Sequence, residues 1–162
     1  MEIKAKIDIT EIKSGMFWHE DDTFSFERLP DKKIKAIVEL VENDVIYGDL
    51  TASEICQIEE GKGSWNYAKV FITTVLRFQY KCKDNERIVL YDQNQSSQLF
   101  LNYEDVAKAF SKIGKKSRQG AYWTSDAIEA KKAIALWSEG SIETMPKSNW
   151  CNIRPVLALK IK

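Results

Sequence analysis

The spacing of apolar residues changes twice along the 162-residue chain, and this order restricts the folds that the chain can adopt. Residues 3–9 alternate apolar and charged side chains, and residues 34–50 are rich in β-branched residues; both patterns are typical of strands. Residues 64–81 and about 96–113 instead place apolar side chains on one face of a helix. From Tyr122 onward the pattern is strand-like again. This order predicts a segregated α+β fold rather than alternating βαβ units.

Turn signals separate the predicted strands. Residues 15–33 mix aromatic and turn residues and predict a short strand followed by a loop. Residues 34–50 predict two strands around a turn at Glu42–Asp44. A further short strand is predicted at residues 87–92. The Ser-Glu-Gly-Ser sequence within residues 133–145 indicates a hairpin.

The ends of several predicted elements carry their own signals. Ser64 is suited to cap the first helix, and Gly114 is a natural stop after the second. Pro155 indicates an edge position or the start of the closing strand, because it cannot donate a ladder hydrogen bond. The apolar face of the first helix comprises Trp65, Ala68, Phe71, Ile72, Val75 and Leu76. That of the second comprises Leu99, Tyr103, Val106, Ala107, Phe110 and Ile113.

Length and charge narrow the class of protein. A chain of this length forms one domain and buries roughly 70% of its unfolded surface, so a core is feasible without metal or disulfide. The 24 Lys and Arg residues balance 24 Asp and Glu residues, which argues against nucleic-acid binding. The basic run at residues 112–118 is most simply a solvated helix end and loop. No apolar run is long enough to predict a membrane-spanning helix, so we expect no membrane insertion.

Two features bear on the cellular compartment. The first residues contain no apolar signal core, which predicts a cytoplasmic chain or one from which an export signal has been removed. The sequence contains three cysteines, Cys56, Cys82 and Cys151. An odd number of widely spaced cysteines argues against a disulfide framework, and no two have the Cys-x-x-Cys spacing of a metal site. We therefore expect three reduced, mostly buried thiols.

Standard catalytic and metal-binding motifs are missing from the sequence. His19, the single histidine, lies in Trp-His-Glu-Asp-Asp, but neighbouring loop residues rarely converge on one ion without a further ligand. A hydrated loop is the favoured interpretation, and a Cys–His nucleophilic pair would need a cysteine beside His19. Phosphate-binding loops, the Gly-x-Ser-x-Gly elbow and His-Glu-x-x-His are absent. We expect no enzyme activity, no cofactor and no metal.

Aromatic and small polar residues of the last forty positions are the candidates for binding. Tryptophan is enriched in binding hot spots and sugar-stacking platforms, although a strand tryptophan is more often part of the core. We expect two of Trp123, Trp137 and Trp150 in the core. Residues 138–152 suit adaptable recognition or form an ordinary polar hairpin, and loop 114–121 is a second candidate. The candidate binding residues are Trp137, Ser138, Glu139, Ser148, Asn149 and Trp150.

Five short segments occur in the order of a known pattern. They are SWNYAKVF at 64–71, NYEDVAKAFSKIG at 102–114, AYWTSD at 121–126, ALWSEGSI at 135–142 and IRPVLAL at 153–159. Together they resemble a bacterial domain family of unknown function with a C-type-lectin-like fold. Its members show Ser-Trp-x-x-Ala, Trp-Arg-Leu-Pro, Tyr-Trp-Ser-Ser and Val-Arg-Pro-Val, and occur in exported and surface proteins. Trp-Arg-Leu-Pro is absent here, where Arg87 holds a comparable place, and the lectin calcium triplets are also absent.

The resemblance implies a specific arrangement of this chain. Two helices would flank antiparallel strands, and the terminal strands at residues 3–9 and 153–159 would pair. Tyr122 and Trp123 would be core residues, and Arg154 would be tied to a nearby carbonyl or carboxylate. The loops would then provide the working surface, because such scaffolds host many unrelated tasks.

Three functions fit that scaffold. The first is a non-enzymatic binding module that presents its loops to a protein or glycan ligand. The second is a structural or assembly subunit of a surface appendage or phage particle, in which the fold forms oligomers. The third is an enzyme similar to the formylglycine-generating oxidases, which needs a reactive pair such as Cys82 and Cys151. The resemblance favours the first, with an exported or cell-surface location.

Overall fold

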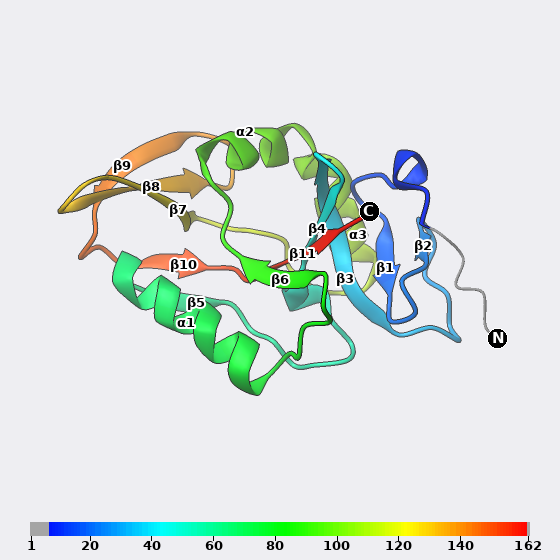
Figure 1. The fold of residues 1–162 in the computed structure, drawn as a ribbon. Coiled ribbons are helices and arrows are strands. Elements are labelled where there is room, and N and C mark those ends of the chain that lie inside the picture. Colours follow the sequence, from blue (N-terminus) through cyan, green and yellow to red (C-terminus); the bar gives the residue numbers. More distant parts are fainter. Residues whose placement is uncertain (1–6, 162) are drawn as a thin grey trace.

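Two sheets and three α-helices make up the α+β fold of residues 7–161, which the computed structural model describes (Figure 1). One sheet contains β1 (Phe17–His19), β2 (Phe24–Ser25), β3 (Ile34–Glu42), β4 (Val45–Asp49), β6 (Glu86–Val89) and β11 (Val156–Lys160). Its strand order is β2-β1-β3-β4-β11-β6. The other contains β5 (Gly61–Gly63), β7 (Ala121–Glu129), β8 (Lys132–Trp137), β9 (Ile142–Pro146) and β10 (Cys151–Ile153). Its order is β5-β10-β7-β8-β9, and only β10 and β7 pair in parallel among the described strands.

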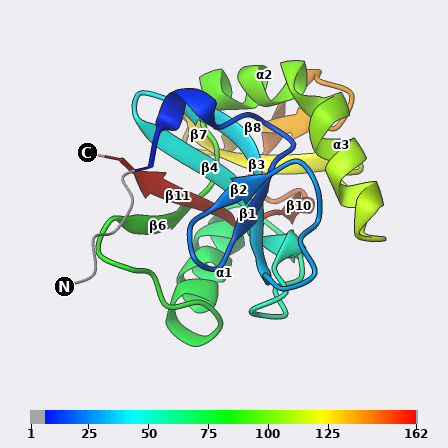
Figure 2. The same ribbon diagram turned by 90° about the vertical axis from the view of Figure 1, so that its right-hand side faces the viewer.

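Helix α1 (Trp65–Phe78) lies on one side of the strands, and α2 (Gln93–Leu101) and α3 (Tyr103–Lys112) lie on the other (Figure 2). The Ser64 side chain accepts a hydrogen bond from the Tyr67 N–H, which confirms the predicted start of α1. The second predicted helix is instead two helices that meet at Asn102. The Asn102 side chain donates to the backbone oxygen of Glu39, and this contact with β3 accompanies the break.

The predicted hairpins are confirmed. β3 and β4 meet at Asn43 and Asp44, which both have positive φ and give the turn its tight reversal. The other hairpin joins β8 and β9, with Gly140 at φ +100°. The 87–92 prediction corresponds to β6. Pro155 immediately precedes β11, in agreement with a strand start.

The pairing of the two terminal strands was wrong. Residues 3–6 lie outside the described part of the chain, and Ile7 and Asp8 are not in a strand. Residues Ile9–Glu11 form a 3-10 turn capped by the Asp8 side chain. The carboxy-terminal strand β11 pairs with β4 on one edge and β6 on the other, so neither edge is left for an amino-terminal strand.

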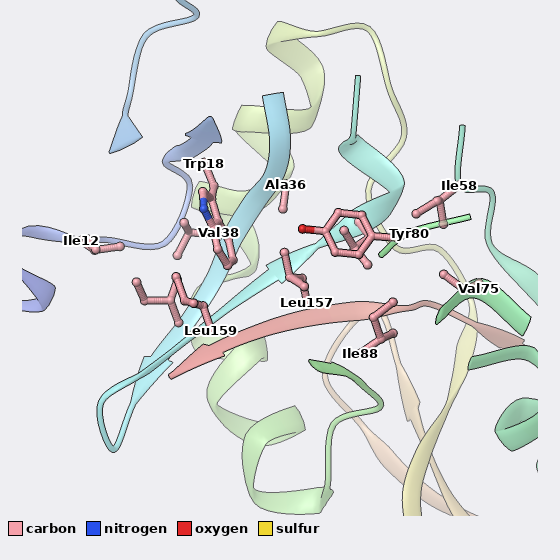
Figure 3. Close-up of a cluster of buried hydrophobic side chains, with 12 residues drawn as sticks. Ile12, Trp18, Ala36, Val38, Ile58, Val75, Tyr80, Ile88, Leu157 and Leu159 are labelled. Carbon is pink, nitrogen blue, oxygen red and sulfur yellow. The ribbon is translucent and has the colours of Figure 1, made fainter. Parts of the chain in front are cut away.

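The core surrounds the central strands of the six-stranded sheet. One buried cluster contains Trp18, Val38 and Leu157. Ile88 of β6 and Val75 of α1 belong to the same cluster (Figure 3). All five residues of β4 are buried, and this makes it a strand covered on both faces. A Cβ on Gly48 would lie 2.8 Å from the Ala36 Cβ, so glycine allows β4 to approach its neighbours closely. Asp49 at the end of β4 is consequently carried into the interior.

Candidate functional site

Two irregular segments enclose a polar pocket of about 660 Å³, here called the loop pocket. One segment is residues 51–60, which begin in the 3-10 turn Leu50–Ala52 after β4, and the other is residues 115–119, which follow α3. Thr51, Gln57, Glu60, Lys116, Gln119 and Arg154 are among the residues that line it. The second segment belongs to loop 114–121, which the sequence suggests as a binding loop. The pocket therefore lies where polar residues from distant parts of the chain converge.

Arg154 ties the walls of the loop pocket together. Its side chain is buried just before β11, and its Nε lies 2.8 Å from Oδ2 of Asp49. Its Nη2 donates to the Thr51 hydroxyl and to the Lys116 backbone oxygen, each at 2.8 Å. The Nη1 atom lies 3.5 Å from a carboxylate oxygen of Glu60. The tie to a carbonyl and a carboxylate that the resemblance implies is thus present.

Arg118 corrects the expectation that the basic run at residues 112–118 is a solvated loop. Its neighbours Lys115 and Lys116 are exposed, but Arg118 itself is buried. Its Nη2 lies 2.9 Å from Oε1 of Glu39, and the Tyr91 hydroxyl donates to the same oxygen at 3.0 Å. Burial opposes the charged guanidinium, yet the carboxylates of Glu39 and Asp49 outweigh burial and raise the pKa of Arg118. The side chain therefore stays charged inside the fold.

A β-bulge aims Glu39 at this arginine. The register of β3 against β4 shifts between Val38 and Leu40, so Glu39 is the extra residue on β3. Burial raises the pKa of Glu39, and the charge of Arg118 opposes that shift. No sequence motif marks the pair, because the two residues are 79 positions apart.

Side-chain hydrogen bonds between loop 115–119 and the rest of the fold hold this loop, although it has no regular secondary structure. The Lys115 ammonium donates to the backbone oxygens of Thr51 and Ser53. Tyr103 donates to the backbone oxygen of Arg118, and Asn152 to that of Gln119. With the contacts of Lys116 and Arg118, four of the five residues of this loop are tied to other parts of the fold. A loop held in this way is preorganised, so a ligand would not have to order it.

Three of the sequence-predicted binding residues lie beside this loop. The Gly120 N–H donates to the Ser138 hydroxyl at 3.2 Å, and the Ser138 backbone N–H donates to the Gly120 backbone oxygen at 2.9 Å. Trp137 is half-buried, and its indole N–H donates to Glu143 at 2.7 Å. Glu139 is exposed in the same turn. The turn at residues 137–139 therefore continues the rim formed by loop 115–119.

The other three predicted residues lie elsewhere. Ser148, Asn149 and Trp150 follow the far end of β9, whose five residues span about 17 Å. Trp123 is buried at 3% exposure, Trp137 is half-buried and packs against the core cluster of Trp65, and Trp150 is 71% exposed. The expectation of two core tryptophans is therefore met in full by Trp123 and only in part by Trp137. The structure thus divides the predicted binding residues between two ends of one strand.

His19 is a buried strand residue, and the expectation of a hydrated loop was wrong. It is the last residue of β1 and has no exposed surface. Its Nε2 lies 2.7 Å from the Ser25 hydroxyl on the neighbouring strand β2. Burial, assisted by the positive charge of Lys32, lowers the pKa of His19 below its ordinary value. Within residues 7–161, no group of three or more His, Cys, Asp or Glu side chains is arranged to hold a metal ion.

His19 should make stability depend on pH in a defined direction. Above the ordinary histidine pKa of 6.5, the ring is neutral in folded and unfolded chains. As the pH falls below 6.5, the unfolded chain takes up the proton first, so the free energy of unfolding decreases until the folded-state pKa is reached. Urea unfolding between these pH values should show this loss in the wild type and a smaller loss in His19→Gln. Equal losses in both proteins would contradict the assignment.

Cys82 and Cys151 lie in different core clusters, and their thiols stay protonated. Cys82 packs against the core cluster of Trp18, whereas Cys151 belongs to the cluster of Trp65, where its sulfur lies 3.5 Å from that of Met145. Burial raises the pKa of both thiols to about 11. A reactive pair requires lowered pKa values, so the shift is opposite to the one that the oxidase alternative needs.

A scan of known protein families finds none that matches the chain, and no curated protein matches it. The functional argument therefore depends on the geometry of the chain itself. Within residues 7–161, every helix is too short or too polar to cross a lipid bilayer.

Proposed function

We propose that the chain is a non-enzymatic binding module on a C-type-lectin-like scaffold, which presents its loops to a protein or glycan ligand. The observation that carries this proposal is the loop pocket, whose irregular wall at residues 115–119 is held by the buried Arg118 and Arg154. Burying the Arg118–Glu39 and Arg154–Asp49 ion pairs costs free energy of desolvation. Both pairs hold loop 115–119 in one conformation. Ligand sites are commonly built from such loops on a rigid scaffold.

The lining of the loop pocket suits a ligand rich in hydroxyl or amide groups. Lys116 offers an ammonium donor and Glu60 a carboxylate acceptor. Gln57 and Gln119 are exposed and carry amides that both donate and accept. Sugars and peptide backbones present the matching mixture of donors and acceptors.

A larger ligand would contact surfaces beyond the pocket. The turn at residues 137–139 borders loop 115–119, so it belongs to the same surface. Trp150, with Ser148 and Asn149, forms a separate exposed contact at the far end of β9. An exposed tryptophan beside small polar residues is typical of a binding hot spot.

A glycan array, followed by thermal-shift assays of the hits with and without calcium, tests the proposal. A ligand that prefers the folded chain must raise its melting temperature. We expect Gln57→Ala with Lys116→Ala to weaken binding about tenfold, a loss of about 1.4 kcal/mol. Glu139→Ala tests the neighbouring turn and Trp150→Ala the far end of β9, so the three variants locate the contact.

Two results would redirect the function. If no glycan binds and no variant changes capture of a purified protein ligand, the binding proposal fails. If sedimentation then reveals concentration-dependent oligomers, the alternative of an assembly subunit takes its place. Exposed Leu101 and Trp150, at 75% and 71%, are the side chains that such an interface would use.

A further inference from the structure

A second pocket, of about 480 Å³, runs along the free edge of β6 and is here called the edge groove. Helix α1 forms one side through Trp65, Lys69 and Ile72. The start of α2 lies on the other side and contributes Gln95 (Figure 1). Arg87 and Ile88 of β6 form the wall between them. Because β6 ends the six-stranded sheet, the edge groove lies where a further strand would add.

Backbone groups of β6 that do not pair with β11 face the free edge of the sheet, where the edge groove lies. The Lys160 N–H donates to the Asn85 backbone oxygen at 3.0 Å, which makes these two residues a hydrogen-bonded pair of the antiparallel ladder. Such pairs alternate, so the backbone groups of Arg87 face β11 and those of Ile88 face away from it. No hydrogen bond found among the described residues uses the Ile88 N–H or C=O in that direction. These are the groups that an added strand would pair with.

The lining of the edge groove contains two cationic side chains and one carboxylate. Arg87 is exposed and makes no ion pair with any described residue. The Lys69 ammonium lies 4.1 Å from the centre of the Trp65 ring rather than beside an acid. The one carboxylate in the lining, that of Asp92, caps α2 by accepting a hydrogen bond from the Gln95 N–H and offsets only one of the two positive charges. The groove is therefore suited to an acidic partner.

We propose that the edge groove binds an extended acidic peptide segment, which joins the six-stranded sheet as a strand beside β6. Neighbouring residues of a strand point to opposite faces, and Ile88 packs in the cluster that contains Val75 of α1. Arg87 therefore lies on the other face, with Val89 and Tyr47. A bound peptide would alternate apolar side chains toward Ile72 with acidic side chains toward Arg87.

Fluorescence anisotropy with a labelled peptide of sequence Ser-Glu-Val-Glu-Val-Glu-Ser tests this proposal on the full chain. We expect saturable binding that Arg87→Glu weakens at least about tenfold, because the charge that faces the acids is reversed. Lys108→Glu is the matched control: it is exposed on α3, outside the edge groove, and should leave binding unchanged. A peptide with Lys in place of Glu should not bind.

Backbone readouts separate strand addition from simple charge attraction. A peptide N-methylated at its central amides should bind at least about tenfold more weakly, since it cannot donate to the sheet edge. Amide exchange at Ile88 should slow when the unmodified peptide binds. The proposal is overturned if no binding saturates below about 1 mM, or if N-methylation and Arg87→Glu both leave the affinity unchanged. These outcomes are independent of the loop pocket, which Arg87 does not line.

Discussion

Replacing Arg154 with methionine is expected to lower the free energy of unfolding by about 3–5 kcal/mol, the usual cost of removing one partner from a buried ion pair. The substitution introduces an apolar side chain of similar length but removes the one cation in contact with the Asp49 carboxylate among the described residues. That side chain has no exposed surface, so water cannot solvate the charge. Urea unfolding of Arg154→Met and of the wild type measures the difference.

Two further variants identify the cause of that loss. Arg154→Met combined with Asp49→Asn should cost less than the sum of the single changes, because no buried charge is left unpaired. Arg28→Met removes an arginine from its pair with Glu54, but the two side chains are 46% and 28% exposed. We expect this surface pair to contribute only about 0–1 kcal/mol. Equal losses at Arg28 and Arg154 would show that burial of the pair is not the cause.

Arg154→Met should also loosen the loop pocket. The guanidinium donates to the Lys116 backbone oxygen, and this anchor disappears with the substitution. Amide hydrogen exchange in loop 115–119 should accelerate more than exchange in β4 or β11. Unchanged exchange in the loop would mean that Lys115 and Arg118 suffice to hold it.

Local signals predicted most of the elements because the physics behind them is local. Ser64 caps α1 through a bond to a residue three positions later, and the hairpins depend on residues within their own turns. The break at Asn102 is instead accompanied by a long-range hydrogen bond to Glu39 of β3. The sequence around Asn102 continues the helical spacing, so only the contact with the sheet reveals the division into α2 and α3.

The candidate site was harder to predict because it consists of long-range contacts. The sequence singled out loop 114–121 and the turn at residues 137–139, which do lie together. Arg118 has the appearance of one more solvated residue in a basic run, and only the fold places Glu39 opposite it. Lys35 and Glu39 lie within β3, whose other buried residues are apolar. Charged residues in such a strand were the one sequence signal for buried ion pairs.

Lys35 on β3 provides the second large effect. Its ammonium lies 2.5 Å from Oε2 of Glu86 on β6, and the two side chains are 1% and 0% exposed. Lys35→Met should therefore lower the free energy of unfolding by about 3–5 kcal/mol, since it leaves the Glu86 carboxylate buried without a cation. Tyr80 and the Lys83 N–H still donate to Oε1 of Glu86, but neither supplies a positive charge.

Neutralising Glu86 distinguishes the lost charge from lost packing. In Lys35→Met with Glu86→Gln, the amide oxygen still accepts from Tyr80, so most of the stability should return. Lys132→Met, which removes a pair with Glu129 whose side chains are 54% and 58% exposed, should change stability by less than about 0.5 kcal/mol. If the double variant stays as unstable as Lys35→Met, the other contacts of the lysine are the larger contribution. These are its ion pair with Asp22, at 2.9 Å, and its ammonium 5.0 Å from the centre of the Trp18 ring.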